Sequence, residues 1–121
     1  MMSAEIFAGI DFHVQKNYLK KIRDEYLAAN YMEHVMEVVT TYFNISSALI
    51  KSKSRKREIV IPRQIAMYFM WLKNIYSYKE IGIYFNRDHS TVVYSKDTVK
   101  DLMDMDKKYN RKIIEIERLL E

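Results

Sequence analysis

The sequence predicts an all-α protein, a helical bundle that contains a helix-turn-helix. Apolar residues recur at the 3.6-residue spacing of helices through most of the 121 positions. Only two glycines and one proline are present, which leaves little material for tight β-hairpins. The hydrophobic content of 49% is enough for one modest core. We therefore expect one helical domain at residues 32–121, preceded by an arm and an extra helix at residues 1–31.

The composition excludes several kinds of site. Because the chain has no cysteine, it has neither disulfides nor thiolate metal ligands. The histidines at positions 13, 34 and 89 lack the spacing of a metal-binding motif. No apolar run is long enough for a membrane span, and no signal-peptide pattern is present. We expect no metal, no cofactor and no membrane contact, and a location in the cytoplasm with the nucleoid.

The first thirty residues divide into a weakly patterned part and a helical part. Residues 1–15 predict a mobile arm or a short segment that is fixed against the domain. Residues 16–30 predict a helix with a single apolar stripe, formed by Leu19, Ile22, Tyr26 and Ala29. Such a stripe has to be buried, either on the rest of the domain or on a second copy of the chain. The sequence leaves both open.

Two helices and a basic loop follow. A helix is predicted from residue 32 to residue 43, with Asn44 as its stop and with an apolar face of Val35, Val38, Val39, Tyr42 and Phe43. Residues 45–50 predict a short helix with a serine N-cap. Residues 51–57 contain five basic residues interleaved with serine, which disfavours a regular helix. A flexible basic loop suits phosphate contacts and the insertion of one arginine into a narrow minor groove.

The next two predicted helices begin at recognisable signals. Pro62 is expected at the first position of a helix that buries Ile65, Ala66, Phe69, Met70 and Leu72. Trp71 is expected in or just beneath the core of this bundle. Ser77 and Glu80 predict a capping box at the start of the first helix of the helix-turn-helix. Within that helix, Gly82 permits close approach of the partner helix.

A polar turn then leads into the second helix of the motif. Asn86 tolerates the left-handed conformation that a tight turn needs, and Asp88 predicts the N-cap. His89, Ser90 and Thr91 fill the first turn, where a recognition helix contacts base edges in the major groove. Val92, Val99, Leu102 and Met103 are expected to hold this helix to the domain. A last helix closes the bundle through Tyr109, Ile113, Ile116 and Leu120.

The charge is concentrated on the part of the chain that holds these motifs. The net charge is +4 overall, −2 in residues 1–50, +6 in residues 51–99 and zero in residues 100–121. A solvated charged surface would explain a basic run that stood alone. Here the basic segment coincides with a polar helix N-terminus, which favours nucleic-acid binding.

Four segments in order resemble the C-terminal DNA-binding domain of the bacterial replication initiator DnaA. They are residues 52–58 (SKSRKRE), 61–68 (IPRQIAMY), 79–82 (KEIG) and 87–92 (RDHSTV). The resemblance implies binding of double-stranded DNA at A/T-rich sites of the DnaA-box type, TTATCCACA or a variant. It also implies a role in replication initiation or its regulation. With only Gly9 and Gly82, the chain has no Gly-x-x-x-x-Gly-Lys loop, which excludes self-contained ATP-driven origin melting.

The resemblance and the residue chemistry together give the candidate DNA contacts. The expected base contacts are Asp88, His89, Ser90 and Thr91 in the major groove and Arg55 in the minor groove, with Arg57 as a rival to Arg55. The expected backbone contacts are Lys53, Lys56, Arg57, Arg63, Gln64, Lys79, Arg87 and Lys96. Gln64 is equally well explained as a first-turn cap residue. Lys79 replaces a proline of many family members, and Asn86 alone replaces a Gly-Gly pair.

Other functions remain as alternatives. Asp88 and His89 are adjacent, so on a helix they are expected to point apart and to make a poor acid/base pair. No nucleophile with an oxyanion site is evident, and we expect no enzyme. A helical protein-interaction module would use the N-terminal helix to bind a replication partner or a second copy. A transcription regulator is also compatible, whereas RNA binding lacks an aromatic-rich sheet or a Gly-x-x-Gly clamp.

Overall fold

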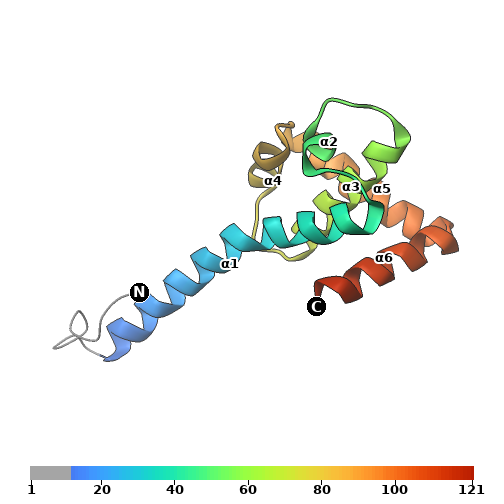
Figure 1. The fold of residues 1–121 in the computed structure, drawn as a ribbon. Helices are drawn as coiled ribbons and strands as arrows, with labels where there is room; N and C mark the ends of the chain where they lie inside the picture. The colour runs from blue at the N-terminus through green and yellow to red at the C-terminus, as the bar shows by residue number, and fades with distance from the viewer. Residues whose placement is uncertain (1–11) are drawn as a thin grey trace. The chain divides into compact units, whose positions relative to one another are not determined.

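The computed structural model describes residues 12–121, which form six helices and no strand (Figure 1). The all-α prediction with a helix-turn-helix is thus confirmed. The helices are α1 (Phe12–Phe43), α2 (Ser47–Lys51), α3 (Arg57–Leu72), α4 (Tyr78–Phe85), α5 (His89–Met105) and α6 (Lys107–Leu120). The chain divides into two compact units, one that ends at Asn30 and one that comprises Tyr31–Glu121. Within residues 12–121, none of the helices combines the length and the apolar content that crossing a membrane requires.

The N-terminal helix differs from the prediction. The expected separate helices at residues 16–30 and 32–43 are one continuous helix, α1. Asn30, where a break was expected, stays helical, and its side-chain amide donates to the carbonyl oxygen of Tyr26 at 2.7 Å. Of the expected arm, residues 1–11 lie outside the described residues, and residues 12–15 are not an arm but belong to α1. The end of α1 is as predicted, because Asn44 adopts a left-handed conformation with φ of 54°.

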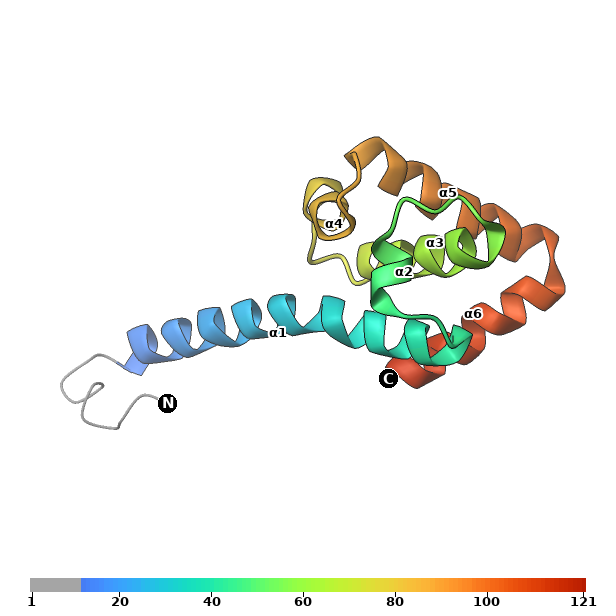
Figure 2. The ribbon, with the colours of Figure 1, turned by 45° about the horizontal axis from the view of Figure 1, so that its top comes forward.

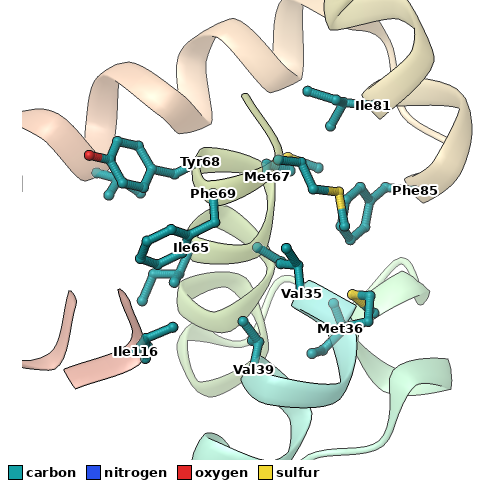
Figure 3. Close-up of a cluster of buried hydrophobic side chains, with 14 of the residues drawn as sticks. Val35, Met36, Val39, Ile65, Met67, Tyr68, Phe69, Ile81, Phe85 and Ile116 are labelled. Atoms are coloured by element: carbon teal, nitrogen blue, oxygen red, sulfur yellow. The ribbon is translucent and has the colours of Figure 1, made fainter. Parts of the chain in front are cut away.

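The core of the unit Tyr31–Glu121 surrounds α3, against which α2, α4 and α5 pack (Figure 2). Figure 3 shows side chains of α1, α3, α4 and α6 that point toward one another, among them Val35, Ile65, Phe85 and Ile116. All four of these side chains are fully buried. Burial of one such side chain stabilises the fold by about 1.5–3 kcal/mol. The apolar stripes predicted within residues 32–121 are therefore the faces that build this core, except that Leu72 is 45% exposed. The stripe predicted at residues 16–30 takes no part in it, because Leu19, Ile22 and Tyr26 are 54%, 40% and 65% exposed.

The start of α3 was predicted too late. Pro62 lies inside the helix, which begins at Arg57. The backbone N–H groups of Ile59 and Val60 both donate to the carbonyl oxygen of Lys56, at 2.9 Å each, and so close the first turn before the proline. Ile59 is buried, 6% exposed, and this burial favours the additional turn. Because of the earlier start, Arg63 and Gln64 lie in the body of the helix instead of its first turn.

The helix-turn-helix is formed by α4 and α5, joined by a very short turn. The predicted capping box is present, since Ser77 accepts from the N–H of Glu80 at 3.0 Å and Glu80 accepts from the N–H of Ser77 at 3.2 Å. Asn86 ends α4 in the left-handed conformation, with φ of 54° and ψ of 48°, as its residue type predicted. The N–H of Arg87 then donates to the carbonyl oxygen of Gly82 at 2.8 Å. This bond folds the turn back onto Gly82.

The last helix, α6, closes the core against α1 and α5. Its N-cap is Asp106, whose carboxylate accepts from the N–H groups of Lys108 and Tyr109 at 2.9 and 3.1 Å. Tyr42 of α1 donates from its hydroxyl to the carboxylate of Glu115. The Tyr109 side chain is 7% exposed, and among the described residues its hydroxyl has no hydrogen-bond partner. An unsatisfied buried hydroxyl costs about 1–3 kcal/mol.

We therefore expect the substitution Tyr109→Phe to stabilise the protein by about 1 kcal/mol at neutral pH. Burial, and secondarily the charge of a neighbouring Tyr68, raise the pKa of Tyr109 to about 12 from its ordinary value of 10.0. Between these two values the native state binds more protons than the unfolded state, so wild-type stability falls as the pH rises. The variant should lose less stability across this window.

Urea unfolding at pH 7 and at pH 11 measures both effects. Tyr94→Phe is the matched control, because the Tyr94 side chain is 66% exposed and its loss of a hydroxyl should leave stability unchanged. Equal unfolding midpoints for the wild type and Tyr109→Phe at both pH values would contradict the expectation.

Candidate nucleic-acid interface

The basic loop connects α2 to α3 and consists of residues 52–56. Its serines explain how it folds, because the N–H of Ser54 donates to the hydroxyl of Ser52 and the N–H of Lys56 to that of Ser54, both at 3.3 Å. These local bonds replace helical bonds and keep the loop irregular, as its composition predicted. The side chains of Lys53, Arg55, Lys56 and Arg57 are all exposed. The loop and the start of α3 thus present four cations to solvent.

Arg63 lies on the inner side of this loop and not on the surface. Its side chain is 6% exposed. Its Nε donates to the carbonyl oxygen of Ile50 at 2.6 Å, its Nη1 to that of Ser54 at 3.0 Å and its Nη2 to that of Ser52 at 2.7 Å. Burial, and then the nearby charge of Arg87, lower the pKa of the guanidinium. The phosphate contact expected for Arg63 would have to compete with these three bonds.

Arg87 approaches the same loop from the helix-turn-helix. This half-buried side chain donates from Nη1 to the carbonyl oxygen of Phe85 at 2.7 Å and to that of Lys51 at 3.4 Å. Its Nη2 donates to the carbonyl oxygen of Ser52. Carbonyls at a helix C-terminus lack intrahelical partners, and here two arginines supply donors to the end of α2.

A third link is made by Lys51, the last residue of α2 and the neighbour of the loop, to Tyr84 of α4. The Nζ of Lys51 lies 4.0 Å from the centroid of the Tyr84 ring, and the Tyr84 hydroxyl donates to a carboxylate oxygen of Glu33 at 2.7 Å. Burial, followed by the hydrogen bond to Glu33, raises the pKa of Tyr84. The phenol therefore stays neutral and remains a donor through the ordinary pH range. The loop is thus connected to α3, to α4 and to the turn before α5.

The start of α5 differs in one respect from the prediction. Asp88 occupies the N-cap position, but its side chain makes no capping hydrogen bond. Instead its carboxylate lies 2.9 Å from Nδ1 of His89. The two adjacent residues, expected to point apart, meet because the N-cap backbone is extended, with φ of −67° and ψ of 149°. Both side chains are about two-thirds exposed, at 68% and 66%, so the pair faces solvent.

The other residues of α5 divide between surface and packing. Ser90 is exposed and Thr91 is half-buried. Tyr94, which the sequence analysis did not single out, is 66% exposed and follows Ser90 by one helical turn. Because residues at i and i+4 share a helix face, this spacing from Ser90 would have identified Tyr94 as a candidate contact residue. The Lys96 side chain, an expected contact to the DNA backbone, is only 13% exposed, and its Nζ lies 5.0 Å from the centroid of the Trp71 ring.

The loop and the helix-turn-helix enclose one surface pocket between them. This basic pocket has a volume of about 390 Å³ and is lined by residues 51–55, Arg63, Asn86 and Arg87. Of the remaining expected contacts, Lys79 is exposed near the start of α4 and Gln64 is half-buried on α3. Among the described residues, no group of three His, Asp or Glu side chains is placed to hold a metal ion. The arrangement is a cationic surface suited to an extended polyanion.

The family model of the bacterial DnaA protein helix-turn-helix matches residues 32–99 of the chain. The chromosomal replication initiator protein DnaA of Bacteroides thetaiotaomicron is 39% identical over 90 residues, which cover 74% of this chain and 19% of that protein. The same protein of Bacteroides fragilis is 34% identical over 112 residues, or 92% of this chain and 24% of that protein. The Chlorobaculum tepidum protein is 35% identical over 113 residues, or 93% and 23%.

The matches cover most of this chain but only a small part of each relative. The chain spans about a quarter or less of the length of these relatives. The two longer matches exceed nine-tenths of the chain, so they extend beyond residues 32–99 and include part of the segment before residue 31. The segment before residue 31, which was expected to be an arm and a helix additional to the family domain, therefore has a counterpart in part in these two proteins.

Proposed function

Because the chain belongs to the family of the bacterial DnaA helix-turn-helix, we propose that it binds double-stranded DNA sequence-specifically, in replication initiation or in its regulation. The observation that supports this proposal is the basic pocket. It is bounded on one side by Lys51 and residues 52–55 of the basic loop, and on the other by Asn86 and Arg87 of the turn that leads into α5. A duplex presents a groove on each side of a phosphate backbone, so two such elements beside one cationic pocket match its shape.

The proposed base contacts follow from exposure and chemistry. Asp88, His89, Ser90 and Thr91 would lie in the major groove, where a carboxylate accepts from a cytosine amino group and a threonine methyl meets a thymine methyl. Arg55 would enter a narrow minor groove, which A/T-rich sequence favours, with Arg57 as the alternative. Sites of the DnaA-box type are the first candidates because the relatives are named as replication initiators.

Their burial divides the residues proposed to contact the DNA backbone into two groups. Lys53, Lys56, Arg57 and Lys79 are exposed and suit phosphate contact. Gln64 is half-buried on α3 and keeps its proposed contact as a single hydrogen bond. Arg63, Arg87 and Lys96 already have partners inside the protein. For these three residues we propose that holding the DNA-binding elements in place comes before any phosphate contact.

Fluorescence anisotropy with a labelled duplex tests the proposal. The wild type should prefer a duplex with a DnaA box over a scrambled duplex of equal composition by at least ~1,000-fold at physiological salt. Binding to both should weaken steeply as salt is added. Arg55→Glu should abolish the preference, whereas Lys112→Glu, an equal charge change at an exposed position of α6, should leave it unchanged. Equal binding to both duplexes would contradict box specificity, and binding to neither would contradict DNA binding.

A second candidate is a protein-interaction module, with the N-terminal part of α1 as its surface. Within the unit that ends at Asn30, Leu19 is 54% exposed and Tyr26 is 65% exposed. This segment would bind another replication protein or a second copy of the chain. An apolar interface should be insensitive to salt, in contrast to phosphate contacts. Sedimentation of Leu19→Glu against the wild type at low and high salt would separate this candidate from the first.

A further inference from the structure

We propose that Arg87 is a positioning residue that holds the basic loop in a fixed position relative to the recognition helix α5. The specificity of DNA binding then depends on the fork shape of its guanidinium and not on its charge. This inference rests on the proposed function, because it concerns how the two DNA-contacting elements are combined. It assigns to Arg87 a role inside the protein in place of the phosphate contact that its position next to Asp88 suggested.

The contacts of Arg87 place it between the two elements. Its backbone belongs to the turn, because its N–H donates to the carbonyl oxygen of Gly82 at 2.8 Å and the next residue is the N-cap of α5. Its side chain donates to Phe85 at the end of α4 and, through Nη2, to the carbonyl oxygen of Ser52 in the loop. One residue therefore connects the position of the loop to the position of the helix start.

The carbonyl oxygen of Ser52 is the point at which two arginines meet. It accepts from Nη2 of Arg87 and also from Nη2 of Arg63, at 2.7 Å in the second case. Two guanidinium charges that share one carbonyl oxygen repel each other, and the dipoles of the carbonyls that accept from them offset that repulsion. Arg63 fixes the loop to α3, and Arg87 fixes the same peptide to the helix-turn-helix. Without Arg87 the loop would remain attached to α3 but would lose its register with α5.

Only the arginine fork can satisfy this geometry. Phe85 and Ser52 belong to different elements, and their carbonyl oxygens accept from different terminal nitrogens of one planar group. A lysine ammonium is a single point on a flexible stem and cannot hold both carbonyls in fixed directions. Arg87→Lys therefore separates the two roles, because it retains the charge that a phosphate contact needs and loses the bridge that positioning needs.

The test measures Arg87→Lys by anisotropy with the box and scrambled duplexes, at a temperature where circular dichroism shows the variant fully folded. Affinity for the box should fall by about 10- to 100-fold, the range of one lost base contact. Affinity for the scrambled duplex and the salt dependence of binding should stay unchanged. Lys79→Gln is the contrasting control. Loss of an exposed phosphate contact should weaken binding to both duplexes equally, and it should reduce the slope of log affinity against log salt by about one.

Hydrogen exchange of the free protein gives a second measurement that needs no DNA. In Arg87→Lys the backbone amides of residues 52–56 should exchange about tenfold faster or more, while those of Val99 in the core of α5 stay protected. Unchanged loop exchange together with wild-type box affinity would overturn the proposal. An equal loss of affinity for both duplexes would also overturn it and would assign to Arg87 a contact with a DNA phosphate. If the wild type shows no box preference, the proposed function fails, and loop exchange alone decides whether Arg87 holds the loop.

Discussion

Replacing Gly82 with alanine should destabilise the fold and, in the same step, abolish the proposed sequence-specific DNA binding. A Cβ at this position would lie 2.6 Å from the carbonyl oxygen of Arg87 and 3.4 Å from the backbone nitrogen of His89. The first of these contacts is to backbone, so no side chain can rotate away, and the turn itself has to move. Overpacking of this kind costs about 1–3 kcal/mol. The helix propensity of alanine over glycine offsets only about 0.5–1 kcal/mol of that cost.

The effect on binding should exceed the effect on stability. The atoms displaced by the new methyl group belong to Arg87, Asp88 and His89, which set the position of the start of α5. Thermal unfolding and box-binding anisotropy measure the two consequences separately. Ile83→Ala is the control, because Ile83 is the next residue of α4 and is 68% exposed. A Gly82→Ala protein with wild-type melting temperature and box preference would mean that the turn relaxes without cost.

Arg63→Ala should also have a large effect. It should lower the stability of the free protein, so the effect is measurable without DNA. The substitution removes the donors from the carbonyl oxygens of Ile50, Ser52 and Ser54. Ile50 is fully buried, so its carbonyl has no ready replacement, whereas Ser52 retains Arg87. We expect a destabilisation of about 3 kcal/mol, the cost of a buried unsatisfied group together with lost charge-assisted bonds. Urea unfolding at neutral pH measures it.

Arg57→Ala is the matched control for that experiment. It removes the same charge from the same helix, but Arg57 is exposed at the first position of α3. Exposed substitutions of this kind usually change stability by less than about 0.5 kcal/mol. If the two variants unfolded at the same urea concentration, the three carbonyl contacts would contribute nothing to stability, and Arg63 would return to the proposed phosphate contacts.

Most of the helices could be predicted because their signals are local. The capping box at Ser77 and Glu80 and the left-handed turn at Asn86 depend on a few neighbouring residues, and both are present. The periodic apolar stripes identified the buried faces of α5 and α6, such as Val92 and Ile113, because every packed helix must bury one face. The missing break in α1 shows the limit, since asparagine is tolerated in a helix when its side chain bonds to the preceding turn.

The role of Arg63 could not be predicted from its charge. With Pro62 taken as the first helical residue, Arg63 counted as a first-turn side chain directed to solvent. In the helix that actually begins at Arg57, Arg63 shares a face with Ile59 and Met70, both of which are buried. A basic run does not reveal which of its members turn inward, because that depends on carbonyls from a distant segment. The Asp88 and His89 pair has a similar cause, since helical spacing does not apply to an N-cap residue.

The surroundings of Trp71 make the protein its own spectroscopic probe. Trp71 is the only tryptophan of the chain, on α3, and two ammonium groups of α5 lie near its ring, Lys96 at 5.0 Å and Lys100 at 5.5 Å. Indole emission responds to nearby charge and to exposure, so a displacement of Lys96 and Lys100 from the Trp71 ring should change its intensity without a label. A movement of α5 relative to α3 is therefore expected to appear as a change of intrinsic fluorescence.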